Sequence, residues 1–146
     1  MEESLTLLKL IKRDFGLGEV DLRTLSPLTL AFVGDCVYDL ILRTVIVERH
    51  NASPNQLHRE KSRLAKASAQ AEMAEALQEH LTQEEIAVYR RGRNAKSHTT
   101  AKNASVLDYR KATGLEALYG WLYLSGQEER LLQLIRISLD VLGWRL

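Results

Sequence analysis

The chain has 146 residues, of which 45% are hydrophobic and 27% are charged, as is ordinary for a globular protein. Its formal net charge is only +1, so the overall charge does not indicate a nucleic-acid-binding protein, and such a site would need local segregation of charge. The single cysteine, Cys36, excludes an internal disulfide and is expected in the core, and no apolar run approaches the roughly 18 residues of a membrane-spanning helix. Because residues 1–3 are acidic, unlike a signal peptide, we expect a cytoplasmic protein that forms one domain over residues 1–146.

Helix signals recur along the whole chain, and no segment alternates with the period of two that a strand requires. Ser4 is expected to cap the first helix, Ser26 and Pro27 to start the second, and Thr82 with Glu85 to form a capping box. The predicted helices cover about 5–16, 27–49, 54–80, 83–92, 104–126 and 128–142. The inward stripe expected for the second helix is Leu30, Val33, Val37, Leu40, Ile41 and Val45. The pattern predicts an all-α fold, a compact bundle of six or seven helices.

The second predicted helix contains an unusual segment, Phe32-Val33-Gly34-Asp35-Cys36-Val37-Tyr38-Asp39. Gly34 is a poor helix former, about 1 kcal/mol less favourable than alanine, and indicates close approach of another helix. Asp35 and Asp39 are four residues apart and therefore point to one face. Two neighbouring carboxylates repel one another unless a cation lies near them, and one interpretation is therefore a Mg²⁺ site. The alternative is that Asp39 pairs with Arg43, again four residues on, while Asp35 satisfies buried donors.

A second candidate segment is Thr113-Gly114-Leu115-Glu116-Ala117-Leu118-Tyr119-Gly120. Glu116 stands among apolar residues, and the small residues of the segment would let another helix approach closely. If that helix is the one that carries Asp35, the two carboxylates converge on one cation, which would lower the pKa of bound water and shield a phosphate. The alternative is an ordinary helix-packing motif with an exposed glutamate.

Residues 90–103 form a basic segment with five arginines or lysines and no acidic residue, interleaved with a glycine, hydroxyls and amides. Such a segment suits contacts to phosphate and sugar oxygens, and in a chain of near-zero net charge it is a local electrostatic footprint. The candidate RNA-binding residues are Arg90, Arg91, Arg93, Lys96, Ser97 and Lys102. A solvated surface loop remains the alternative, because charge alone does not separate the two.

Together these segments resemble the catalytic domain of ribonuclease III, and specifically its short Mini-ribonuclease III branch. Residues 32–35 resemble the second half of the ribonuclease III signature, and residues 116–124 resemble its second acidic motif. Residues 91–97 are similar to a segment typical of the branch, and residues 57–72 also fit. The resemblance covers about residues 25–135, and the motifs are specific in this order and at these spacings.

The resemblance implies an all-α homodimer of the ribonuclease III endonuclease-domain type, without a separate double-stranded-RNA-binding domain. It also implies Mg²⁺-dependent hydrolysis of double-stranded RNA, with water as the nucleophile, 5′-phosphate products and the 23S ribosomal RNA precursor as the usual substrate. Asp35 takes the place of the signature aspartate and Glu116 that of the glutamate in the second motif, so both are expected to be metal ligands and catalytic residues. Phe32 occupies the position that inserts into the partner subunit.

Three positions depart from the family pattern. The full signature has glutamates where Leu28 and Ala31 stand, and the second motif has an aspartate where Thr113 stands. We therefore expect fewer protein ligands beside Asp35, with water filling more of the metal shell, while Asp39 is either a carboxylate behind the ligands or an ion-pair partner. The missing carboxylates keep an alternative open, namely a non-catalytic ribonuclease III-like protein that only binds RNA or ribosomal particles. A helical adaptor for protein partners is a further alternative.

Overall fold

The computed structural model describes residues 5–96 and 105–146, and within these ranges every regular element is a helix. The α-helices are α1 (Leu7–Asp14), α2 (Pro27–Arg49), α3 (Pro54–Ala65), α4 (Ala67–Leu77), α5 (Gln83–Asn94), α6 (Val106–Leu124) and α7 (Glu128–Leu142). Two short 3-10 helices are η1 (Leu22–Thr24) and η2 (Gln78–His80). The predicted all-α fold is confirmed. No helix in the described ranges is long and apolar enough to cross a membrane.

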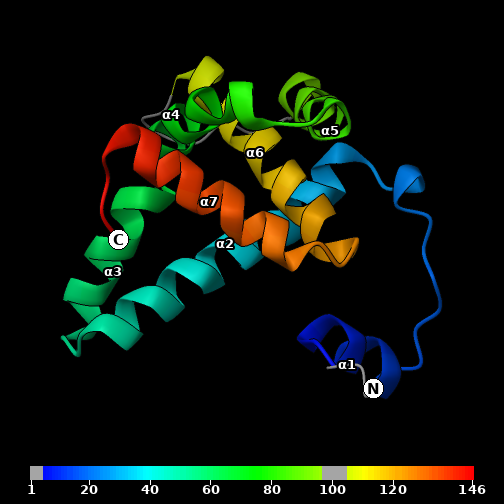
Figure 1. The fold of residues 1–146 in the computed structure, drawn as a ribbon, viewed down its shortest axis with the longest axis horizontal. Helices are drawn as coiled ribbons and strands as arrows, with labels where there is room; N and C mark the ends of the chain where they lie inside the picture. The colour runs from blue at the N-terminus through cyan, green and yellow to red at the C-terminus, as the bar shows by residue number, and fades with distance from the viewer. Residues whose placement is uncertain (1–4, 97–104) are drawn as a thin grey trace.

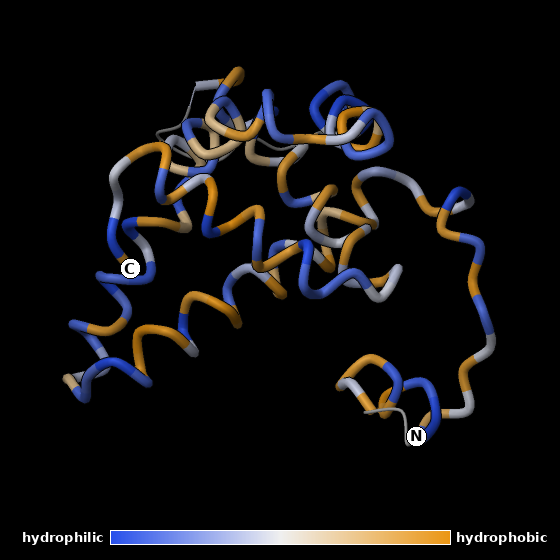
Figure 2. Tube along the Cα trace, viewed as in Figure 1, coloured by the Kyte–Doolittle hydropathy of each residue, from blue (hydrophilic) through white to orange (hydrophobic). Residues whose placement is uncertain are grey.

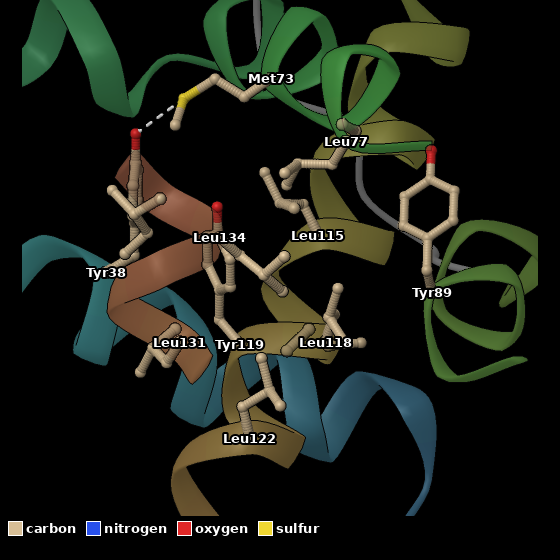
Figure 3. Close-up of a cluster of buried hydrophobic side chains, with 14 of the residues drawn as sticks. Tyr38, Met73, Leu77, Tyr89, Leu115, Leu118, Tyr119, Leu122, Leu131 and Leu134 are labelled. Atoms are coloured by element: carbon tan, nitrogen blue, oxygen red, sulfur yellow. Dashed lines mark hydrogen bonds between the residues drawn. The ribbon is translucent and has the colours of Figure 1, made fainter. Parts of the chain in front are cut away.

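Helix α6 is the centre of the fold, and α2, α4, α5 and α7 pack around it (Figure 1). Every residue from 112 to 122 is buried except Glu116 and Trp121, which are partly exposed. Figure 3 shows side chains from the surrounding helices closing over α6, among them Tyr38 of α2 and Leu134 of α7. Because α6 is enclosed on most sides, it is a rigid support for the one carboxylate that it carries in this stretch.

Three helices begin where the sequence predicts, each with a hydroxyl side chain that accepts a hydrogen bond from a backbone N–H of the first turn. The capping residues are Ser26 for α2, Ser53 for α3 and Thr82 for α5. Thr82 and Glu85 form the predicted reciprocal capping box. The first helix begins later than predicted, at Leu7, with Thr6 as its cap, whereas the predicted cap, Ser4, lies outside the described residues.

The buried face of α2 differs from the prediction by one residue. Leu30 of the predicted inward stripe is buried as expected, and Val37 and Ile41 are only partly buried against the core. Beyond Leu30 the fully buried side chains are Tyr38 and Leu42, one position after Val37 and Ile41, and Leu40 is exposed. Hydrophobic residues recur along the whole of α2 (Figure 2), so their periodicity alone does not select a face. Cys36, expected in the core because free cysteines are usually buried, is exposed.

The single long helix predicted over residues 54–80 is divided into α3, α4 and η2. Lys66 has an extended backbone (φ −66°, ψ 153°) and stands between the end of α3 and the start of α4. Such a break frees carbonyl groups at the end of a helix. The Tyr38 hydroxyl donates to the Leu64 carbonyl at 2.8 Å, and Nε2 of Gln70 donates to the Ala65 carbonyl at 2.8 Å. One of these partners comes from α2, so the local pattern of this segment could not show the break.

Helix α5 continues to Asn94, two residues beyond its predicted end at Gly92. A Cβ added to Gly92 would lie 2.7 Å from Cβ of Ala117 and 2.9 Å from Cα of Gly114, both on α6. Gly92 is therefore a close-packing residue within the helix and not a helix terminator. This contact fixes the end of α5 against the part of α6 that carries Glu116.

Candidate active site

Two glycines allow α2 and α6 to approach at backbone distance. A Cβ on Gly34 of α2 would lie 1.7 Å from the carbonyl oxygen of Glu116, and a Cβ on Gly120 of α6 would lie 1.9 Å from the carbonyl oxygen of Leu30. Only a residue without a side chain fits at either place. The close approach predicted at Gly34 is confirmed, and the helix that approaches is the one that carries Glu116.

The crossing brings Asp35 and Glu116 side by side, and we refer to them as the acid pair. Asp35 is exposed on α2, whereas Glu116 on α6 is half-buried. Burial, together with the hydrogen bonding and negative charge of the neighbouring Asp35, raises the pKa of Glu116 to about 9. A proton retained on one of two adjacent carboxylates is the expected response when no cation offsets their repulsion. The structure thus brings together the two carboxylates that the sequence singles out, which are 81 residues apart in the chain.

Two further side chains, Gln70 and Tyr38, lie close to Glu116 and were not predicted to do so. Gln70 of α4 is 3% exposed, and hydrogen bonding from its amide works to lower the pKa of Glu116. Burial raises the pKa of the Tyr38 hydroxyl, and the negative charge of Glu116 adds to that effect. Both side chains also donate hydrogen bonds to the carbonyl groups left free where α3 ends. This arrangement depends on the fold and cannot be read from the spacing of residues.

A Mg²⁺ ion fits the acid pair by its donor chemistry. Mg²⁺ prefers a few carboxylate oxygens and retains several waters, so two carboxylates on well-packed helices suit it. Oε1 of Gln70 adds a buried acceptor that has no hydrogen-bond partner among the described residues. Across residues 5–96 and 105–146, no three His, Cys, Asp or Glu side chains gather as a larger metal cage.

Asp39 is held by two cationic side chains. Its Oδ2 accepts a hydrogen bond from Nε of Arg43 at 2.6 Å, and its Oδ1 lies 3.1 Å from Nζ of Lys61 on α3. Partial burial works to raise the pKa of Asp39, but the bonds from Arg43 and Lys61 outweigh it, and the pKa lies below its ordinary value. The structure thus shows the ion pair with Arg43 that was one of the two alternatives, and Lys61 as an additional partner.

The basic segment begins on a helix and not in a loop. Arg90 and Arg91 are exposed in the last turns of α5, Arg93 lies 5.8 Å from the Tyr89 ring centre, and Lys96 is exposed just beyond the helix. The other two predicted RNA-binding residues, Ser97 and Lys102, lie outside the described residues. Because Gly92 anchors this end of α5 on α6, the cationic groups begin close in the fold to the helix that carries Glu116.

Helix α2 also presents an exposed stripe of residues four positions apart. The α2 stripe consists of Leu28, Phe32, Cys36 and Leu40. Phe32 is 81% exposed, an unusual degree for a large aromatic side chain in a folded protein. Exposed apolar side chains along one face of a helix are typical of an interaction site. Asp35 lies on the same helix, between Phe32 and Cys36 of the stripe.

The sequence and the fold both have known relatives. A family model described as "Ribonuclease III domain" matches residues 28–127, a range that contains the whole acid pair. A curated "Mini-ribonuclease 3" from a Thermoanaerobacter species is 50% identical over 119 residues, which are 82% of this chain and 84% of that protein. Another from Clostridium tetani is 42% identical over 134 residues, 88% and 89% of the two chains. A crystal structure of a protein from Fusobacterium nucleatum matches with a TM-score of 0.75 and 28% identity, covering 84% of this chain and 98% of that one.

Proposed function

This chain belongs to the ribonuclease III family, in its Mini-ribonuclease 3 branch, and from that premise we propose that it is a Mg²⁺-dependent endoribonuclease that cuts double-stranded RNA. The observation that carries the proposal is the meeting of Asp35 and Glu116 where α2 crosses α6. Family membership supplies the class of reaction, and the acid pair supplies a place where that reaction can occur. The products are expected to carry 5′-phosphate ends.

In this mechanism the acid pair would hold the cation, and the bound cation would lower the pKa of a water nucleophile and neutralise charge on the phosphate. Glu116 must release its proton to act as a ligand, and a nearby positive charge favours that release. Asp35 is the exposed member of the pair, so it is the carboxylate that a substrate on the surface reaches. The glycine-mediated helix crossing keeps both groups in place during the reaction.

Duplex RNA is recognised mostly by its shape, its phosphates and its 2′-hydroxyls across the minor groove. We assign the phosphate contacts to the basic segment, with Arg90, Arg91, Arg93 and Lys96 at the end of α5 and Ser97 and Lys102 beyond the described residues. The packing of Gly92 on Ala117 supports this assignment, because it fixes the end of α5 beside the turn of α6 that carries Glu116.

The α2 stripe supports a homodimer in which Phe32 inserts into the partner subunit. Exposure of such apolar side chains to water is unfavourable. Association of two identical faces about a twofold axis would bury them. Because Asp35 follows Phe32 on the same helix, such a dimer would place one acid pair on each side of the interface. Two sites related in this way would suit the two strands of an RNA duplex.

The family resemblance also supports the 23S ribosomal RNA precursor as the substrate and the cytoplasm as the location. The test of this substrate is maturation of the precursor in cells that produce only an Asp35→Asn protein. Accumulation of unprocessed precursor is expected, and normal processing would assign the chain to another RNA.

The proposed activity is tested by cleavage of a long RNA duplex with and without Mg²⁺. The parent is expected to cut only with Mg²⁺, and Asp35→Asn and Glu116→Gln are each expected to lose activity by several orders of magnitude. Asp140→Asn, at an exposed carboxylate on α7, is the matched control and is expected to cut normally. Binding without cutting by the parent would support the non-catalytic RNA-binding alternative, and no binding even at low salt would support a helical adaptor.

A further inference from the structure

Gln70 is one of the side chains in the described part of the chain that have a buried oxygen without a hydrogen-bond partner. It is 3% exposed, on a helix whose other buried residues are apolar. Its Nε2 donates a hydrogen bond to the carbonyl oxygen of Ala65 at 2.8 Å. Its Oε1 is buried without a hydrogen-bond partner among the described residues. One end of the amide is therefore anchored and the other end is unsatisfied.

An unsatisfied buried acceptor destabilises a protein, because the group has lost its hydrogen bond to water and gained none in return. Such an acceptor is explained when a ligand, an ion or an ordered water supplies the missing interaction. Because Nε2 is fixed on the Ala65 carbonyl, the amide cannot turn over to satisfy Oε1 elsewhere. The side chain also lies beside Glu116, so whatever completes it is close to the acid pair.

We infer that Gln70 is a positioning residue of the acid pair, and that its Oε1 accepts a hydrogen bond from a water carried by the divalent cation at Asp35 and Glu116. The inference rests on the proposed function, since it assumes the cation. Mg²⁺ binds through a few carboxylates and keeps several waters, which outer acceptors hold in place. Among the described residues no third His, Cys, Asp or Glu side chain joins the acid pair, so a cation held there would keep several waters, one of which the Gln70 oxygen can orient.

The competing explanation is that Gln70 only closes the helix break at Lys66. Gln78, at the other end of α4, provides a comparison, because its Nε2 donates to the Ala74 carbonyl at the same distance of 2.8 Å. Gln78 is partly exposed, and its Oε1 is not a buried unsatisfied atom among the described residues. A glutamine can therefore donate to a carbonyl at a helix end without leaving its own oxygen buried and unsatisfied. The buried, unsatisfied Oε1 of Gln70 therefore needs a separate explanation.

The experiment measures Mn²⁺ affinity by electron paramagnetic resonance, with Mn²⁺ standing in for Mg²⁺. Gln70→Met and Gln70→Glu both lose the amide N–H groups that bond to the Ala65 carbonyl and to Glu116, but only Gln70→Met also loses the acceptor oxygen. We expect Gln70→Met to weaken Mn²⁺ binding by about 10–100-fold, the usual effect of removing an outer partner of a metal site. Gln70→Glu is expected to bind at least as tightly as the parent, and Gln78→Met to bind as the parent does.

Each outcome separates the two roles. Equal Mn²⁺ affinity in Gln70→Met and the parent would overturn the inference while leaving the proposed function intact. Equal weakening in Gln70→Met and Gln70→Glu would show that the lost amide donor, and not the oxygen, accounts for the effect, and would also overturn the inference. A parent that binds no Mn²⁺ would refute the proposed metal dependence itself. Mn²⁺ affinity is also measured for Gln70→Leu, which is expected to weaken binding as Gln70→Met does, so that the result does not depend on how one replacement packs. Circular dichroism in EDTA checks that each variant is folded.

Discussion

Gly34 of α2 packs directly against the backbone carbonyl of Glu116 on α6, where a Cβ at position 34 would lie 1.7 Å from the carbonyl oxygen. The next residue after this glycine is Asp35, so the same contact that joins the two helices also brings the two carboxylates together. The acid pair therefore depends on a backbone contact as much as on the acids themselves.

The first prediction concerns this contact. Gly34→Ala is expected to force the helices apart, lowering the free energy of unfolding by about 3 kcal/mol or more and separating the acid pair. Urea denaturation and Mn²⁺ binding both report the change. Gly18→Ala is the control, because a Cβ there meets nothing within 4 Å, and it is expected to change stability by less than about 1 kcal/mol. A Gly34→Ala protein with parental stability and Mn²⁺ affinity would show that the crossing is not needed.

The second prediction is a pH dependence of stability when divalent cations are removed with EDTA. The pKa of Glu116 is raised to about 9 from an ordinary 4.5, so across this window the folded chain holds a proton that the unfolded chain has released. Stability therefore falls as pH rises from about 4.5 to 9, by at most about 1.4 kcal/mol per pH unit. Glu116→Gln removes this contribution, so the parent is expected to lose more stability than Glu116→Gln between about pH 6 and 8.5.

Urea denaturation at the two pH values measures this difference. Added Mg²⁺ is expected to stabilise the parent more at the higher pH, where less work is needed to remove the proton from Glu116. Parallel pH profiles for the parent and Glu116→Gln would mean that Glu116 ionises normally and is not in contact with Asp35.

The sequence predicts those features that leave a local mark in the chain. Helix α7 is found over its predicted residues, because regularly spaced leucines lie between two glycine breaks. The acid pair could be anticipated because Gly34 and Gly120 signal a close helix crossing next to each acid. These features reflect steric requirements at single positions, and so they can be recognised in the sequence before the three-dimensional fold is known.

Other features depend on distant partners and could not be predicted in this way. The break at Lys66 is stabilised by Tyr38 from α2, and the burial of Gln70 follows from how α4 packs against α6. The predicted buried face of α2 is right at Leu30 and wrong by one residue further along, because apolar residues occur on all sides of the helix. One exposed set of them forms the α2 stripe. In each case the deciding contact is between elements that are far apart in the chain or that belong to another molecule.

The third prediction concerns the basic segment. Arg91→Ala and Lys96→Ala are each expected to weaken binding of duplex RNA by a similar factor for all sequences, and to reduce the slope of log affinity against log salt by about one. Binding is measured at several salt concentrations on duplexes of different sequence. Arg136→Ala, at an exposed arginine on α7, is the control and is expected to leave both quantities unchanged. A changed sequence preference would contradict the assignment of these residues to phosphates.

The fourth prediction concerns the α2 stripe. Phe32→Asp places a charge at the centre of the proposed dimer interface, where its desolvation opposes association, so the variant is expected to sediment as a monomer while the parent sediments as a dimer. Val141→Asp, at an exposed valine on α7, is expected to remain dimeric. A parent that is monomeric at all concentrations, or a dimeric Phe32→Asp protein, would place the partner surface elsewhere.

The most direct test of the central claim is an anomalous difference map from crystals grown with Mn²⁺. The account predicts a manganese peak within coordination distance of the carboxylates of both Asp35 and Glu116. A map with no peak at this position, or with manganese bound only elsewhere while the two carboxylates stay apart, would contradict it.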